Sequence, residues 1–245
     1  MINNNNNNSI INKIPMKWWT LYKDEIRSME HVISFILLFV SLVGSLYVFF
    51  NSKFLQLVVL LITGTISNVS YYHAISFYVL AGALPFICLI LFYDAIYRDL
   101  EDERVRIIVT KMRRIEYLFA KFLSRLTVIT TVLIGIIFFI SIYSYLELGD
   151  LYTAISIKMF IVFFLLSIFL GTIYLLISCF SEHPLFVSLL VPIISFIMME
   201  TGPRELSFFN YLGVGVLNVS IIGFMLSGAL LTFMTTAFFF KRKRL

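Results

Sequence analysis

Long apolar runs separated by short polar segments make up most of the chain. A helix needs roughly 20 apolar residues, at 1.5 Å each, to cross about 30 Å of hydrocarbon. Five runs are close to that length or exceed it, and a sixth, 184–199, is slightly shorter but carries no charge until Glu200. The pattern predicts an all-α integral membrane protein with six transmembrane helices, at about 33–50, 75–93, 126–146, 158–180, 184–199 and 213–239.

Composition agrees with this class. Of the 245 residues, 60% are hydrophobic and 26 are Phe, and only 13% are charged. The mean hydropathy is +0.95. Such a chain has too few polar side chains to cover the surface of a water-soluble globule, so the composition excludes the ordinary soluble classes.

A seventh apolar stretch, 54–66, determines on which side of the membrane each loop lies. Its 13 residues suit an interfacial or re-entrant segment better than a crossing. With six spans and the N-terminus inside, sixteen of the 19 Lys and Arg residues are cytoplasmic, and the other three are Lys53, Lys158 and Arg204. Because cytoplasmic loops carry an excess of positive charge, we predict a multi-pass protein of the cell membrane with cytoplasmic N- and C-termini.

The residues before the first span divide into two parts. Residues 1–12 are rich in Asn and are predicted to be a disordered tail, which leaves 13–245 as a single transmembrane domain. Within 14–30, apolar residues recur at helical spacing with charged residues on the other side. This pattern predicts an amphipathic elbow helix in the inner membrane interface, with Trp18 and Trp19 as anchors among the lipid headgroups.

The segment between the second and third predicted spans, 94–125, holds 14 of the chain's 33 charged residues. Placing them in hydrocarbon would cost about 2.5–3.5 kcal/mol each, so the segment is predicted to be a cytoplasmic loop. Acidic residues come first and basic residues later, which favours a helix that begins near Asp99. Intervals of three and four then predict one continuous apolar face, formed by Val105, Ile108, Met112, Ile115, Phe119 and Phe122.

This loop resembles the corresponding loop of ABC-2 type transporter permeases. In that family, an Asp-x-Ile motif is followed by acidic residues, a short apolar run, an Arg-x-Glu motif and a Lys that opens the third span. The matching residues here are Asp94-Ala95-Ile96, the acidic group Asp99, Glu101 and Glu103, the run Ile107-Ile108-Val109, the motif Arg114-Ile115-Glu116, and Lys121. The elbow, the six spans and the basic C-terminal tail also follow the family's layout.

The resemblance implies the permease subunit of an ATP-driven exporter. Such permeases form the membrane path with a second permease copy or a homologue, contact membrane lipid, and pair with two cytosolic ABC ATPase subunits that bind the ATP. The loop supplies the coupling helix that docks into the ATPase. On this comparison, the expected coupling residues are Asp94, Asp99, Glu101, Glu103, Arg113, Arg114, Glu116 and Lys121.

No residue pattern indicates a catalytic centre. The sequence contains no G-x-x-x-x-G-K phosphate loop, so ATP hydrolysis is expected in a separate subunit. His31, His73 and His183 are expected at the elbow end, in an outer loop and in an inner turn, and they lack metal-ligand spacing. We therefore expect no enzyme activity, metal or cofactor in this chain, and no nucleic-acid partner.

Other interpretations stay open. A secondary transporter would need ionisable residues near the bilayer centre or broken helices in matching halves, and the predicted spans contain few of either. A non-transporting scaffold or immunity-type membrane protein has no distinguishing pattern. For the loop alone, a basic surface resting on anionic lipid would explain its positive half but not its acidic half. The cargo is not encoded in any motif, because family membership says little about substrate.

Overall fold

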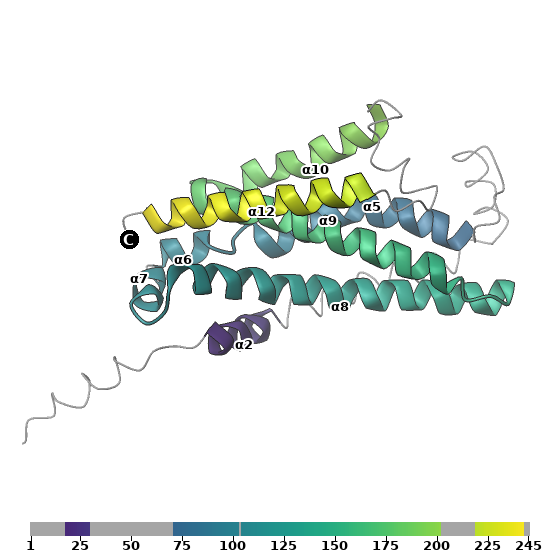
Figure 1. The fold of residues 1–245 in the computed structure, drawn as a ribbon, viewed down its shortest axis with the longest axis horizontal. Helices are drawn as coiled ribbons and strands as arrows, with labels where there is room; N and C mark the ends of the chain where they lie inside the picture. Colours follow the sequence, from purple (N-terminus) through teal and green to yellow (C-terminus); the bar gives the residue numbers. More distant parts are fainter. Residues whose placement is uncertain (1–17, 30–70, 103, 202–218, 243–245) are drawn as a thin grey trace, which may run out of the picture.

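The computed structural model describes residues 18–29, 71–102, 104–201 and 219–242, and every regular element in these ranges is a helix (Figure 1). The helices are α2 Trp18–Ser28, α5 Tyr71–Phe92, α6 Tyr97–Glu101, α7 Arg104–Val109, α8 Arg114–Leu148, α9 Thr153–Phe180, α10 Pro184–Thr201 and α12 Val219–Arg242. The predicted all-α class is thus confirmed for these ranges. The predicted tail 1–12, the first span 33–50 and the stretch 54–66 lie outside the described residues.

Within the described residues, four helical segments are long and apolar enough to cross a membrane, so the chain is a multi-pass membrane protein. They are Leu80–Glu101, Arg114–Leu146, Thr153–Phe180 and Ile222–Arg242. They overlap the predicted spans at 75–93, 126–146, 158–180 and 213–239. Within α10, the counterpart of the predicted span 184–199, Pro184–Ser195 is a shorter apolar helix. The total of six spans and the side of each loop stay predictions.

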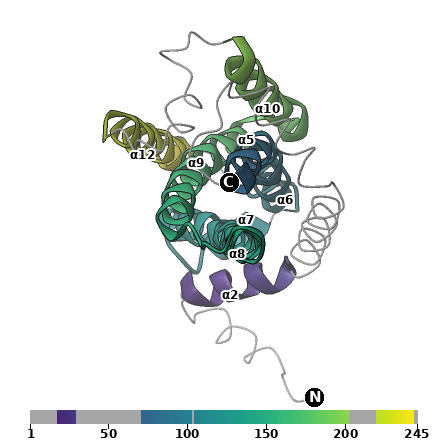
Figure 2. The same cartoon turned by 90° about the vertical axis from the view of Figure 1, so that its right-hand side faces the viewer.

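Helix α9 is the central element of the bundle. It packs against α5, α8 and α12 and less extensively against α10, while α2 packs on the outside of α8 (Figure 2). Close packing depends on Gly171 of α9, where an added Cβ would lie 2.9 Å from the ring of Phe92 in α5. The fully buried rings of Phe163 and Tyr174 continue the same core along α9.

The chain between α5 and α8 turns twice. A turn at 93–96 leads into α6, which carries Asp99 in its first turn, close to the helix start that the acidic residues predict. Helix α7 then ends at Val109, where the Thr110 hydroxyl donates to the carbonyl of Ile107 at 2.7 Å. Because a side chain that bonds to the backbone competes with helix continuation, this contact accompanies the end of α7.

The predicted continuous apolar face from Val105 to Phe122 is therefore wrong. Helix α8 begins only at Arg114, after a break at 110–113. On either side of the break the apolar residues lie in different surroundings, since Val105 is buried in the core whereas Ile115 is exposed. Periodicity in sequence cannot show such a break, because the residues after it resume the same spacing on a helix of a different direction.

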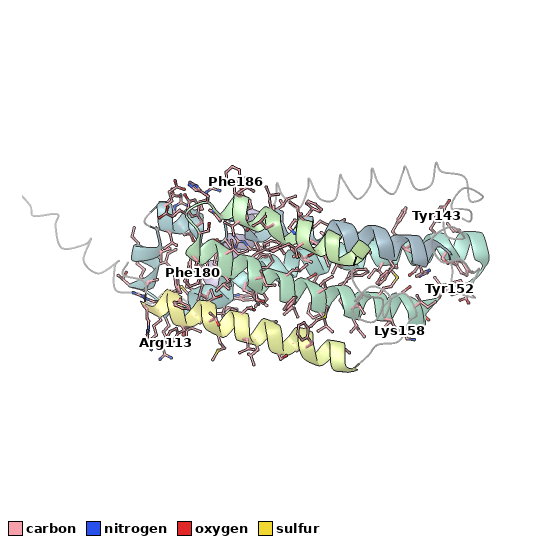
Figure 3. The ribbon with its side chains drawn as sticks, turned by 90° about the horizontal axis from the view of Figure 1, so that it is seen from above. Arg113, Tyr143, Tyr152, Lys158, Phe180 and Phe186 are labelled. Atoms are coloured by element: carbon pink, nitrogen blue, oxygen red, sulfur yellow. The ribbon has the colours of Figure 1, made fainter. Side chains whose placement is uncertain are left out.

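Helix α8 is longer than a bilayer requires. Its 35 residues extend about 52 Å at 1.5 Å per residue. It ends at Leu148 and is capped by Gly149, whose φ of 75° is the left-handed conformation that glycine adopts freely. We call the end of the bundle that carries α6, α7 and the C-terminus of α12 the loop end (Figure 1). Figure 3 places Arg113 and Phe180 at this end, and Tyr143, Tyr152 and Lys158 at the far end.

Cysteine labelling tests the predicted sidedness. The native thiols of Cys88 and Cys179 are buried, so the background is low. We expect a membrane-impermeant maleimide to modify Asp150→Cys at the far end in intact cells, and to modify Thr110→Cys at the loop end only after permeabilisation. Both positions are exposed in the folded chain. Modification of Thr110→Cys in intact cells would place the loop outside and contradict the topology.

Candidate functional site

Helix α2 turns a buried face toward α8, and that face includes a carboxylate. Leu21 and Met29 are buried. Glu25 lies midway between them at four-residue spacing, so the three residues share one side of the helix. The Tyr22 hydroxyl lies 3.0 Å from Thr127 Oγ1 of α8, which fixes the approach of the two helices. The Glu25 carboxylate is therefore carried into the interface with α8.

Helix α8 supplies two buried cations. Tyr117, Lys121 and Arg125 follow one another at four-residue spacing and share one face. Lys121 is only 3% exposed and Arg125 only 6%. Buried charges are costly unless paired and hydrogen-bonded, so this face of α8 requires carboxylates beside it. They come from α2 and from the segment 94–99.

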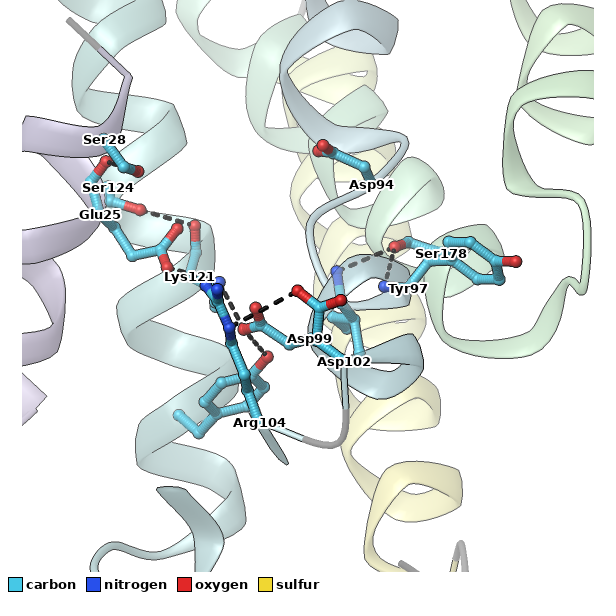
Figure 4. Close-up of polar contacts among 12 residues, drawn as sticks. Glu25, Ser28, Asp94, Tyr97, Asp99, Asp102, Arg104, Lys121, Ser124 and Ser178 are labelled. Atoms are coloured by element: carbon cyan, nitrogen blue, oxygen red, sulfur yellow. Dashed lines mark hydrogen bonds and ion pairs between the residues drawn. The ribbon is translucent and has the colours of Figure 1, made fainter. Parts of the chain in front are cut away.

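Lys121 lies between two carboxylates that come from different elements (Figure 4). Its Nζ is 2.5 Å from Glu25 Oε1 of α2 and 2.6 Å from Asp99 Oδ2 of α6. The Tyr117 hydroxyl donates to the same Asp99 oxygen at 2.7 Å. One ammonium group thus joins α2, α6 and α8, and the tyrosine satisfies a further lone pair of the aspartate.

Arg125 extends these contacts to the end of α5. Its Nη1 donates to Glu25 Oε2 at 3.0 Å, and its Nε donates to the carbonyl of Leu91 at 2.6 Å. Asp94 Oδ1, in the turn after α5, is 3.8 Å from Arg125 Nη2. The guanidinium fork therefore contacts α2, the end of α5 and the turn after α5 through three different nitrogen atoms.

We call these six residues the charge cluster: Glu25, Asp94, Asp99, Tyr117, Lys121 and Arg125. It contains two cations and three carboxylates, and each cation contacts at least two carboxylates. A buried ion-pair network adds less stability than well-packed apolar residues would, but removing one partner leaves an uncompensated buried charge. The cluster therefore holds α2, the turn 93–96, α6 and α8 in one particular arrangement.

Asp94, Asp99 and Lys121, three of the predicted coupling residues, are thus brought together within this cluster. Asp99 and Lys121 are both buried, so in this structure they contact other parts of the chain and do not form part of its surface. From the sequence, few ionisable residues are expected within the spans. The charge cluster does bury charged side chains, and it lies at the loop end of α8. A part in coupling for these residues stays a prediction.

Other residues of the loop do face outward. We call the exposed group of Glu101, Asp102, Arg104, Ile107, Thr110 and Arg113 the loop tip. Arg113 has 89% of its side chain accessible, and its Nε is 4.0 Å from Glu116 Oε1. Arg104 Nε lies 3.5 Å from Asp102 Oδ2. The predicted coupling residue Glu103 lies outside the described residues.

Arg114, a residue of the Arg-x-Glu motif, contacts the end of α12 and is not part of the exposed loop tip. Its Nη1 donates to the carbonyls of Phe240 at 3.0 Å and Lys241 at 2.7 Å, near the end of α12. The last carbonyls of a helix lack partners within the helix, and a cation there also offsets the negative end of the helix dipole. Arg114 therefore caps α12, and its neighbour Arg113 is the better probe of the exposed surface.

The predicted interface anchors lie on the outside of α2. Trp18 and Trp19 are both exposed. The Trp19 ring stacks on Tyr22 with centroids 5.0 Å apart, and Lys23 Nζ lies 5.3 Å from the Trp19 centroid. Trp18 meets the exposed ring of Phe119 of α8 edge to face. This aromatic surface next to a cation suits a headgroup region, and the anchoring role stays a prediction.

Sequence reasoning missed Glu25, Tyr117 and Arg125 as members of a site. A signal exists for each. Glu25 interrupts the buried stripe of α2, and Tyr117 and Arg125 flank the motif residue Lys121 by four positions on either side. The sequence gives no indication that the Glu25 face of α2 packs against the Lys121 face of α8. Among the described residues, no three His, Cys, Asp or Glu side chains are grouped so as to hold a metal ion.

No protein-family model, curated protein or solved structure matches this chain. The fold and the site therefore define a class only: a helical multi-pass membrane protein whose loop end is held by a buried charge cluster.

Proposed function

We propose that the chain is the permease subunit of an ATP-driven exporter of the ABC-2 type, coupled to separate ATPase subunits through the loop 94–125. One observation carries the proposal. The loop is fixed to α2 and α8 by the charge cluster, while the loop tip is left exposed. A segment that passes movement from a soluble partner to membrane helices needs both properties, an accessible surface and a stiff connection behind it.

The chemistry of the loop tip suits a protein partner. It mixes acidic and basic side chains around Ile107, which is 64% exposed. A large apolar side chain surrounded by charges resembles the centre and rim of a protein interface, where the charges orient the partner and the apolar residue supplies contact area. Lipid headgroups alone would favour the basic residues and repel Glu101 and Asp102.

The rest of the chain is consistent with a path-forming subunit. Apolar side chains are exposed along α8 and α12, among them Phe138, Leu146, Phe224 and Leu231. In the membrane, these faces contact lipid or a second permease copy, and we expect a dimer. The sequence contains no phosphate loop, so ATP binding and hydrolysis belong to the partner subunit, and this chain needs no cofactor of its own.

Co-purification with an ABC ATPase, sought first among the products of the genes that flank this chain's gene, tests the proposal. We expect the wild-type chain to bind that ATPase and to stimulate its ATP hydrolysis in lipid. Arg113→Glu and Ile107→Asp should each weaken binding by about tenfold or more, because a central interface residue typically contributes more than 1 kcal/mol. Both side chains make few contacts within the chain, so the variants should fold normally.

A matched control lies at the same end of the bundle. Glu182 is exposed in the turn between α9 and α10 and is not part of the loop tip, so Glu182→Lys should leave binding unchanged. Full binding and stimulation by Arg113→Glu and Ile107→Asp would reject the loop tip as the docking surface. Absence of any ATPase partner, with transport driven by an ion gradient or with no transport at all, would instead favour a secondary transporter or a membrane scaffold.

A further inference from the structure

Ser178, near the end of α9, holds the turn that joins α5 to α6 (Figure 4). Its Oγ accepts hydrogen bonds from the backbone N–H groups of Ile96 at 3.0 Å and of Tyr97 at 3.1 Å. The side chain is fully buried. A hydroxyl oxygen has two lone pairs, so these two bonds use its whole acceptor capacity.

Helix α6 depends on this contact because it lacks a cap of its own. It is only five residues long, and Ile96 at its N-cap position makes no side-chain hydrogen bond. The first N–H groups of a helix have no partners within it, and a helix this short is not stable by itself. A serine usually caps the helix that it precedes. Here the serine comes from a different helix, 81 residues further along the chain from Tyr97.

Helix α9 also binds α5 at two levels farther from the loop. The Tyr174 hydroxyl donates to the carbonyl of Pro85, inside α5, at 2.8 Å. At the far end, Ser156 Oγ lies 2.9 Å from Nε2 of His73, which is buried within α5 rather than placed in an outer loop as expected. Side-chain hydrogen bonds therefore join α9 to α5 along most of their shared length, and Ser178 extends this series to α6.

We propose that Ser178 is a positioning residue that fixes α6 to α9, so that a displacement of the loop is passed to α9 and through it to the far end of α5. The inference rests on the proposed function, since it assigns a route to the movement that an ATPase would impose on the loop. The charge cluster ties the other side of α6 to α8 through Asp99. Helix α6 is thus held between two long helices, and Ser178 provides the hydrogen-bonded connection on the α9 side.

The first measurement is hydrogen exchange of the segment 93–101 in the purified full chain. Ser178→Ala leaves the Ile96 and Tyr97 amides without their acceptor, and we expect them to exchange at least about tenfold faster. Ser178→Thr keeps a hydroxyl and should restore protection. Ser167→Ala is the matched control: Ser167 is equally buried in α9, but its hydroxyl donates to the carbonyl of Phe163 in its own helix and bonds the side chain of Cys88 in α5, not the amides of the segment 93–101. Unchanged exchange in Ser178→Ala would overturn the proposal.

The second measurement separates positioning from general stability. In the reconstituted complex, Ser178→Ala should bind the ATPase with wild-type affinity, because the loop tip is untouched, yet stimulate ATP hydrolysis at least about fivefold less, the low end of typical coupling between sites. Ser178→Thr should recover the stimulation. If Ser178→Ala stimulates ATP hydrolysis as strongly as the wild-type chain does, the proposed role of Ser178 is wrong and the proposed function is unaffected. If the wild-type chain does not stimulate ATP hydrolysis, the proposed function is wrong, and so is the role of Ser178 that rests on it.

Discussion

Replacing Lys121 with Met is expected to lower the free energy of unfolding by about 3–5 kcal/mol, because it leaves Glu25 and Asp99 as uncompensated charges in a buried site. The Met side chain fills a similar volume, so the loss comes from the missing ammonium rather than from a cavity. Lys121 Nζ contacts both carboxylates, at 2.5 and 2.6 Å. Denaturant unfolding in detergent, followed by tryptophan fluorescence of α2, measures the change.

Two variants make this result specific to the charge cluster. Adding Glu25→Gln and Asp99→Asn to Lys121→Met removes the repelling charges and should recover part of the lost stability. Arg113→Met removes a cation that is 89% exposed and should change stability by less than about 0.5 kcal/mol. If Lys121→Met is as stable as Arg113→Met, the charge cluster does not hold the loop end together.

Replacing Arg114 with Ala is expected to destabilise the chain by about 2–3 kcal/mol and to loosen the end of α12. The guanidinium makes charge-assisted hydrogen bonds to the carbonyls of Phe240, in a part-buried position, and Lys241, in an exposed one. A buried bond of this kind contributes about 1.5–3 kcal/mol, and the exposed one adds little because water competes for it. Hydrogen exchange of 237–242 should accelerate while exchange of 153–180 in α9 stays slow. Arg114→Glu should have a larger effect, because it puts a carboxylate against the negative end of the helix dipole.

Arg113→Ala is the natural control, since it removes the same charge from the adjacent residue. Its side chain is exposed and does not reach α12 in the way that Arg114 does. Equal exchange at the end of α12 in the two variants would show that Arg114 is not a cap. The pair also separates two roles of the loop. We expect Arg114 variants to lose stability, and Arg113 variants to keep stability but lose partner binding.

The helices follow from sequence because hydrophobic length alone determines most of them. Helices α8, α9 and α12 cover the predicted spans at 126–146 and 158–180 and most of the one at 213–239. A long apolar run has no alternative to a helix in hydrocarbon, where each backbone polar group must be satisfied within the segment. The start of α6 near Asp99 was likewise indicated by local charge order.

The charge cluster could be predicted only in part. The charges of the loop are visible in sequence, and Asp94, Asp99 and Lys121 are among the residues that the resemblance to the ABC-2 permease loop picks out. The burial of Asp99 and Lys121 depends on Glu25, which comes from a helix 96 residues before Lys121 in the chain. Pairing of this kind is a tertiary event with no local signature. The break at 110–113 is similar, because it separates α7 from α8 without a Gly or Pro to mark it.

Site-specific photo-crosslinking from the loop tip tests the central claim most directly. A photoreactive amino acid placed at Ile107, and in a parallel variant at the exposed apolar position Phe138 of α8, would be activated in intact cells, and the adducts would be identified by mass spectrometry. The account predicts that position 107 captures an ATP-hydrolysing subunit with a phosphate loop, while position 138 does not. Capture of lipid alone at position 107, in cells where the chain is active, would contradict it.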